Sequence, residues 1–129
     1  MELDRICDLL AAHLRGRPEV LFAILYGSAG EGRDFRDLDV AVWVDRARVT
    51  VEAELRYTFD LTDDLEKAVA YPVDVRVIND APLPFRYNVT RGRRLVARDE
   101  EAYYDFLERT RLAWWDFEPV AMAYLRELR

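Results

Sequence analysis

Residues 25–44 read LYGSAGEGRDFRDLDVAVWV, and the two ends of this stretch are the most informative part of the sequence. The segment 19–26 is an almost continuous apolar run, which is typical of a strand buried on both faces. Gly27 and Ser28 end that run, and a charged, glycine-rich segment follows. An apolar run over 37–44 predicts a second strand, so the whole stretch predicts two strands joined by a short polar connection.

Two acidic residues stand at the beginning of the second predicted strand. Successive side chains of a strand point to opposite faces, so Asp37 and Asp39 share one face with Ala41 and Trp43. The other face consists of Leu38, Val40, Val42 and Val44. We therefore expect the face that carries Leu38 and the valines to pack in the core. The two carboxylates should lie at the end of the sheet where this strand begins.

A third acid occupies a comparable position in the segment 72–78, PVDVRVI, which alternates as a strand does. If the two acid-bearing strands are neighbours, Asp74 faces Asp37 and Asp39. Carboxylates this close repel one another when ionised, and a divalent metal relieves that repulsion. Three carboxylates on adjacent strands suit two-metal phosphoryl or nucleotidyl transfer.

Nearby arginines offer a simpler explanation of the same three acids. Arg33 and Arg36 could neutralise the first two carboxylates, and Arg76 could neutralise Asp74. A bare Asp-x-Asp motif is weak, so both explanations stay open at this point.

The turn formed by Gly27 and Ser28 suits a bound phosphate. Gly27 lets the backbone turn sharply and approach a ligand closely. Ser28 adds a hydroxyl and a backbone N–H, and N–H groups at the start of a helix can hold a phosphate. Any strand could end in such a turn, so the turn gains weight only from the acid pair that follows it.

The remaining patterns predict helices around these strands. Helices are expected over 2–15, 50–70, 85–91, 100–112 and from Pro119 onward, with a last short strand over 93–97. Asp99 is expected to cap the helix over 100–112. This order favours an α/β or α+β fold, a small mixed β-sheet packed by helices. The length of 129 residues fits one domain over 1–129, with a core over about 1–98 and C-terminal helices over about 99–129.

Composition excludes several kinds of function. Cys7 and His13 are the only residues of their types, which excludes a disulfide framework and any multi-cysteine or two-histidine metal site. The formal net charge of −6 argues against broad binding to a nucleic-acid backbone. No apolar run approaches the ~20 residues of a membrane helix, and the N-terminus does not resemble a signal peptide. We therefore expect a cytoplasmic protein that does not enter a membrane.

In combination, these motifs resemble the minimal nucleotidyltransferases (MNT) of the polymerase β-like superfamily. The signature of that family is Gly-Ser, a short spacer, Asp-x-Asp and a third Asp on a later strand, which VDVRVIND supplies here over 73–80. The resemblance covers most of the chain. It extends through 81–110, which is similar to the tail of MNT-type antitoxins. Those antitoxins pair with HEPN-domain toxins, which are small helical RNases.

The resemblance implies a role for five residues. Gly27 and Ser28 match the phosphate-binding turn, Asp37 and Asp39 match the paired metal ligands, and Asp74 matches the third carboxylate. It also implies the nucleotidyltransferase fold, ATP as substrate and Mg²⁺ as cofactor, with two ions. The chain would then be a protein adenylyltransferase that moves AMP from ATP to a tyrosine hydroxyl of a HEPN-type toxin and so silences the toxin.

The sequence departs from the family between the two motifs. Eight residues separate Ser28 from Asp37, fewer than the family usually has, and Arg36 stands where the family commonly has Ser. A shorter connection could move Ser28 relative to the metal ligands by several ångströms. Two alternatives stay open: a non-catalytic antitoxin that neutralises its toxin by contact, and a nucleotidyltransferase that acts on a small-molecule alcohol.

The size of the chain favours a protein acceptor. No further domain is left to hold a small acceptor, so the partner or a second copy of this chain would complete the acceptor pocket. The aromatic-rich segment 103–117 is expected to supply core residues, with part of its surface facing a partner. Arg91, Arg93 and Arg94 could approach a triphosphate, although a solvated turn is the simpler interpretation.

Overall fold

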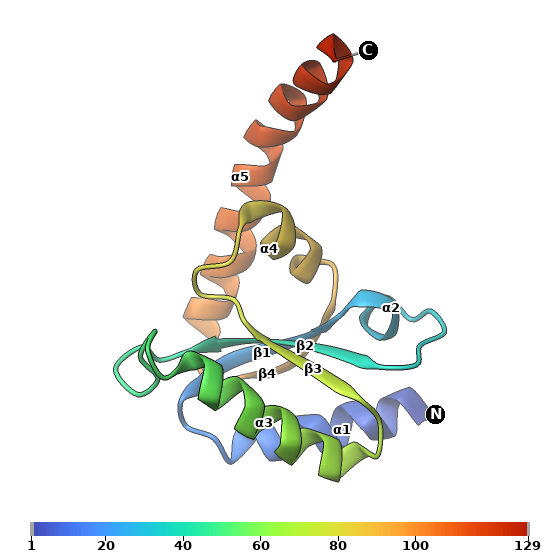
Figure 1. Cartoon of the computed structure of the whole chain (residues 1–129), viewed down its shortest axis with the longest axis vertical. Helices are drawn as coiled ribbons and strands as arrows, with labels where there is room; N and C mark the ends of the chain where they lie inside the picture. Colours follow the sequence, from blue (N-terminus) through green and yellow to red (C-terminus); the bar gives the residue numbers. More distant parts are fainter. Residues whose placement is uncertain (1, 129) are drawn as a thin grey trace.

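The computed structural model describes residues 2–128, which form one four-stranded sheet with helices on both faces (Figure 1). In chain order the elements are α1 (Glu2–Arg15), β1 (Val20–Tyr26), α2 (Gly27–Gly30), β2 (Leu38–Val44), α3 (Glu54–Val69), β3 (Val73–Val77), α4 (Leu83–Thr90), β4 (Arg93–Ala97) and α5 (Glu100–Glu127). The predicted small mixed sheet packed by helices is confirmed. None of the helices formed by residues 2–128 combines the length and the apolarity that crossing a bilayer requires.

The strand order is β3-β2-β1-β4, which makes β3 an edge strand. Strand β1 pairs antiparallel with both β2 and β4, whereas β2 and β3 are parallel and α3 connects them. The register places Asp39 opposite Asp74 across the parallel pair and opposite Tyr26 across the antiparallel pair. The two acid-bearing strands are therefore neighbours, as the candidate metal site requires.

Each face of the sheet has its own core. Helices α1 and α3 cover the face that carries the valines of β2 and β3, and Leu10 and Leu65 are fully buried there. Helices α4 and α5 cover the other face, where Phe22 stacks on Trp43 with ring centroids 5.6 Å apart and contacts Phe106 at 5.4 Å. The alternation predicted for β2 is confirmed, and it leaves Asp39 on the face that α4 covers.

Two helices begin at positions other than those predicted. Helix α3 begins at Glu54 rather than at residue 50, because Thr50 closes a separate turn in which its Oγ1 accepts the N–H of Ala53 at 3.3 Å. Helix α4 begins at Leu83 rather than at residue 85. Pro84 is tolerated in that first turn, where a backbone N–H would have no helical partner.

Helix α5 runs without interruption from Glu100 to Glu127, so the predicted break before Pro119 is wrong. Its predicted cap is confirmed, because Asp99 Oδ1 accepts the N–H of Ala102 at 3.0 Å. Pro119 removes one hydrogen bond from the helix interior. The surrounding segment is exposed, so water can serve the carbonyl that loses its partner.

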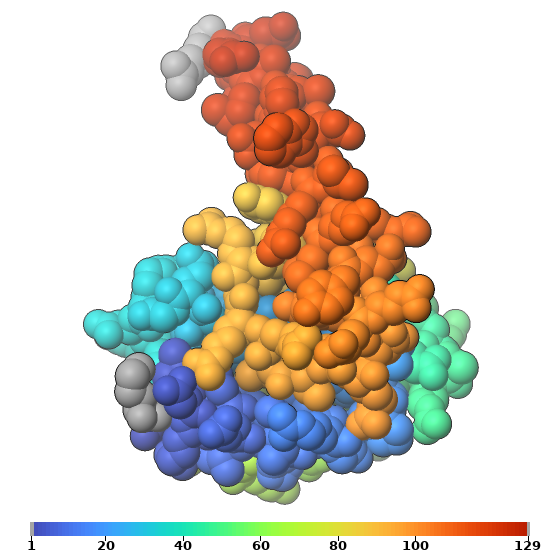
Figure 2. All heavy atoms as spheres, turned by 180° about the vertical axis from the view of Figure 1, so that it is seen from behind, coloured from blue at the N-terminus to red at the C-terminus, as the bar shows by residue number. Residues whose placement is uncertain are grey.

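The C-terminal part of α5 leaves the domain. Trp114 stacks on Tyr87 of α4 with ring centroids 4.5 Å apart, and beyond this contact the helix projects away from the sheet (Figures 1 and 2). We call the exposed apolar residues of this projection the tail surface: Trp115, Phe117, Val120, Met122, Tyr124, Leu125 and Leu128. The aromatic segment 103–117 therefore divides, with Phe106 in the core and Trp115 80% exposed.

Candidate active site

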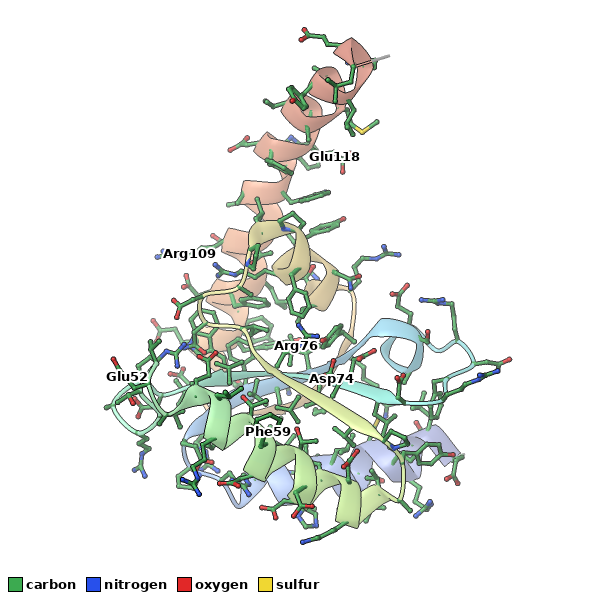
Figure 3. All side chains as sticks on the ribbon, viewed as in Figure 1. Glu52, Phe59, Asp74, Arg76, Arg109 and Glu118 are labelled. Carbon is green, nitrogen blue, oxygen red and sulfur yellow. The ribbon has the colours of Figure 1, made fainter. Side chains whose placement is uncertain are left out.

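The three predicted acids lie at one end of the sheet, with Asp39 and Asp74 on the face that α4 covers and Asp37 just before β2. Asp39 and Asp74 are register partners on adjacent strands, and Asp37 lies two residues before Asp39. Asp39 is half-buried, whereas Asp37 and Asp74 are exposed. Figure 3 shows Asp74 on the side of β3 that faces α4. The structure thus makes Asp39 and Asp74 direct neighbours across two strands, with Asp37 two residues away along the chain.

Negative charge accumulates at this end of the sheet. Burial raises the pKa of the Asp39 carboxyl, and the neighbouring carboxylates of Asp37 and Asp74 raise that pKa further. The phenol of Tyr26 is 5% exposed. Burial first, and then the charges of Asp39 and Asp74, raise its pKa as well, so Tyr26 stays neutral beside the acids. Such a site favours a bound cation.

Ion pairing accounts for only one of the three acids. Arg76 Nε lies 3.4 Å from Asp74 Oδ2, as the simpler explanation predicted. Within residues 2–128, the arginines of the α2–β2 connection form no ion pair with Asp37 or Asp39. The side chains of Arg76 and Asp74 are 59% and 49% exposed, and exposed pairs of this kind contribute at most about 1 kcal/mol.

The chemistry of the three acids fits a divalent metal. Carboxylate oxygens are the ligands that Mg²⁺ prefers, and carboxylates without cationic partners gain most from such an ion. In the part of the chain that the structure describes, no three His, Cys, Asp or Glu side chains stand in ligand geometry. The Asp74 carboxylate contacts Arg76 instead, and turning it toward a metal would cost at most about 1 kcal/mol.

The backbone of the Gly-Ser turn lies against the same acids. Gly27 has a φ of +69°, which a side chain would strain. A Cβ atom on Gly27 would also overlap Asp39 Oδ2 and lie 3.3 Å from Asp39 Cγ. The short connection to β2 therefore still brings the turn directly beside Asp39, and Gly27 is the residue type that permits this approach.

Arg91 in the α4–β4 turn and the two arginines that begin β4 form ion pairs with other parts of the chain. Arg91 contacts Glu31 at 3.4 Å, Arg93 contacts Asp4 at 2.9 Å and Arg94 contacts Glu100 at 3.7 Å. These ion pairs agree with the interpretation of a solvated turn.

A groove beside Asp74 was missed by the sequence reasoning. It has a volume of about 600 Å³ and runs along β3, between the first turns of α3 and the beginning of α4. Leu55 of α3 lines one side, Phe85 of α4 lines the other, and Asp74 and Arg76 lie between them. The groove therefore connects the candidate metal ligands to the outer edge of the sheet.

A sequence signal for this groove was present in α3. Leu61 and Leu65 are fully buried on the core side of the helix, whereas Val51, Leu55 and Phe59 are 62%, 69% and 65% exposed. Leu55 and Phe59 are four residues apart and lie on one face of α3, and Val51 lies in the turn just before the helix, so the three form a second apolar stripe. Two apolar stripes on one helix indicate that it contacts something on each side.

We expect Asp39→Asn to stabilise the fold while removing a candidate metal ligand. Because the pKa of Asp39 is raised on folding, the folded state favours the protonated carboxyl. The protonated carboxyl therefore stabilises the fold at low pH, and this stabilisation is lost as the pH rises through the folded pKa. With chelator at pH 7, Asp39→Asn should melt about 2–5 °C above wild type, the usual effect of one stabilising substitution. The difference should shrink toward pH 3.5. An unchanged or lower melting temperature at pH 7 would contradict the proposed repulsion.

Residues 9–101, more than half of the chain, match the profile of the family described as "Polymerase beta, Nucleotidyltransferase". The chain belongs to this nucleotidyltransferase family. No curated protein sequence is similar enough to count as a match.

Solved structures of three complexes share the polymerase β nucleotidyltransferase fold of this chain. One is the toxin–antitoxin MntA-HepT (17% identity, 98% of this chain and 96% of that chain, TM-score 0.66). A second is a toxin–antitoxin with AMP-PNP (20% identity, 99% and 98%, TM-score 0.68). A third is the tri-AMPylated Shewanella oneidensis HEPN toxin in complex with MNT antitoxin (19% identity, 98% and 95%, TM-score 0.65). At these identities the similarity establishes the fold.

Proposed function

We propose that this chain is an antitoxin that transfers AMP from ATP to a tyrosine hydroxyl of a HEPN-type toxin. One observation carries the proposal: in a chain of the nucleotidyltransferase family, Asp39 and Asp74 lie in register beside Gly27. Two structures of the same fold support the choice of substrates, since one contains AMP-PNP and the other contains an AMPylated HEPN toxin.

The reaction assigns a role to each residue of the site. The acceptor hydroxyl gives up its proton to water, its oxygen forms a bond to the α-phosphorus of ATP, the bond from that phosphorus to the α–β bridging oxygen breaks, and pyrophosphate leaves. Asp37, Asp39 and Asp74 would hold two Mg²⁺ ions, which supply charge neutralisation for the triphosphate and lower the pKa of the acceptor hydroxyl. Asp74 would also orient the proton of that hydroxyl. Gly27 and Ser28 would hold the leaving phosphates through their backbone and hydroxyl groups.

A transfer assay tests the proposal directly. The purified chain, Mg²⁺ and α-labelled ATP are mixed with a candidate HEPN-type toxin, and label is followed by gel and mass spectrometry. Label on a tyrosine of that protein is the expected result. Label on small alcohols alone would overturn the protein acceptor and favour the small-molecule alternative.

Neutralisation by contact alone is the second candidate function, and the tail surface favours it. Exposed apolar patches of this extent mark binding surfaces for other proteins. A helix that is apolar on several sides is usually enclosed by other helices, which suits a helical partner. A stable complex and an inhibited toxin with no label transferred would assign this function instead.

Substitutions on the tail surface should weaken partner binding under either function. Trp115 and Tyr124 are 80% and 62% exposed and are of the residue types that dominate interface energies. We expect Trp115→Ser/Tyr124→Ser to raise the Kd for the toxin roughly 10- to 100-fold in calorimetric titration. Tyr104→Ser is the control, because Tyr104 is 58% exposed on α5 before the projection begins. Equal Kd values for the two variants would exclude the tail surface from the interface.

A further inference from the structure

Strand β3 is the edge strand that borders the candidate site. It carries Asp74, and it pairs with β2 on one side alone among residues 2–128. In Figure 1 it is the strand nearest the viewer, with α3 on one side and α4 on the other. An unpaired edge offers backbone N–H and C=O groups to another extended chain.

The register identifies which backbone groups of β3 are free. Leu38 donates its N–H to the Pro72 carbonyl at 2.9 Å, and Ile78 donates its N–H to the Val42 carbonyl at 3.0 Å. In a parallel ladder every second residue bonds to the neighbouring strand. Residues 72, 74, 76 and 78 therefore face β2, and residues 73, 75 and 77 face outward.

Of the three residues that face outward, two have a backbone N–H that is free to donate to another strand. The N–H of Val73 is bonded to Glu66 Oε2 at 2.9 Å. The N–H groups of Val75 and Val77 have no such partner in the part of the chain that the structure describes. These two residues lie where β3 borders the groove. The edge therefore presents two consecutive outward-facing backbone positions, which is the pattern that an added strand uses.

The walls of the groove suit an extended apolar segment. Leu55 and Val51 flank it on the α3 side, and the ring of Phe85 flanks it on the α4 side. Past the end of β3, Arg46 bridges Glu54 and Asp80 with distances of 2.7 and 2.9 Å and marks one end of the groove. Figure 3 shows Asp74 and Arg76 on the α4 side of β3 and Phe59 on α3 below it.

We propose that the acceptor polypeptide binds in this groove as an extended strand added to the free edge of β3, with its tyrosine beside Asp74. Cross-strand neighbours share a face of the sheet, so a tyrosine opposite Asp74 points to the face that carries the three acids. A helix or a small alcohol could not pair with Val75 and Val77, because neither offers a free backbone ladder. This inference rests on the proposed function, since it names how the acceptor of that reaction is held.

The first test uses a defined peptide and does not depend on catalysis. The peptide has nine residues: a central tyrosine, alternating threonine and valine on both sides, and a lysine at each end. By NMR, saturating peptide should slow amide exchange at Val75 and Val77 roughly fivefold or more. Exchange at Arg76, whose N–H faces β2, should not change. A control peptide with proline on each side of the tyrosine cannot complete the ladder and should protect neither valine.

The second test measures AMP transfer to the same peptide. Val51→Ser/Leu55→Ser removes the apolar wall at two exposed positions and should lower labelling about tenfold. Val77→Pro removes an outward N–H without removing any bond to β2, and it should abolish both protection and labelling. Tyr104→Ser is the matched control, because it removes an equally exposed apolar side chain outside the groove. If Val77→Pro does not fold, the serine variant alone decides.

The outcomes separate this inference from the proposed function. Protection of Val75 and Val77 without any labelling would support the docking site and reject catalysis. Labelling that is equal for the two peptides, or unchanged in Val51→Ser/Leu55→Ser, would leave catalysis standing and overturn strand addition. Absence of protection at saturating peptide would also overturn it. Dimers of the free chain that Val77→Pro dissociates would assign the edge to a second copy and overturn the acceptor site.

Discussion

Asp37→Ala/Asp39→Ala will lower the rate of AMP transfer to the toxin by at least about 1000-fold. Removing a single group that stabilises developing charge commonly costs 100- to 1000-fold in rate, and this variant removes two such groups. Asp39 lies on the face that α4 covers and Asp37 just precedes β2, and within residues 2–128 the neighbouring arginines form no ion pair with either carboxylate. The rate is measured with α-labelled ATP and saturating toxin.

A matched variant separates this effect from a general loss of negative charge. Asp60→Ala/Asp63→Ala removes two carboxylates from the exposed side of α3, away from the site, and should transfer AMP at the wild-type rate. Thermal melting should show that Asp37→Ala/Asp39→Ala is folded, because it relieves repulsion rather than creating a cavity. Full AMP transfer by Asp37→Ala/Asp39→Ala would reject the metal assignment. If Asp37→Ala/Asp39→Ala inhibits the toxin without transferring AMP, the chain neutralises by contact.

The sequence predicted most elements because their patterns are local. The alternation in β2 correctly separated Asp39 from the apolar face, and Asp99 correctly marked the start of α5. Helix α5 was misjudged at Pro119, because a proline is a strong stop signal only where the lost hydrogen bond cannot be replaced by water. Whether Pro119 is exposed depends on the position of the whole helix in the fold, which the local sequence around Pro119 cannot predict.

The sequence singled out candidate site residues but could not give their geometry. That Asp74 could join Asp39 was conditional on neighbouring strands, and only the parallel register makes the two acids direct partners. The free edge of β3 follows from the strand order, which no single segment encodes. Leu55 belongs to the predicted helix over 50–70, but only the packing of that helix shows that Leu55 is 69% exposed while Leu61 and Leu65 are fully buried.

Gly27→Ala will reduce AMP transfer by at least about 100-fold and will destabilise the fold. Two effects act together at this position. The φ of +69° costs an alanine about 1–2 kcal/mol. The new Cβ would also overlap the Asp39 carboxylate, so either the turn or Asp39 must move. A displacement of about 1 Å in a catalytic group can cost 100-fold in rate, and Asp39 is the half-buried member of the acid cluster.

Gly32→Ala has the backbone strain without the overlap, so comparing the two variants isolates the effect of the overlap with Asp39. Gly32 lies in the same connection at a φ of +74°, and a Cβ there would meet no atom within 4 Å. Backbone strain is therefore common to both variants, whereas overlap with Asp39 occurs in Gly27→Ala alone. We expect similar losses of melting temperature from strain, with a further loss and the collapse of AMP transfer only for Gly27→Ala. Equal transfer rates for the two variants would show that the close approach of the Gly-Ser turn to Asp39 does not serve catalysis.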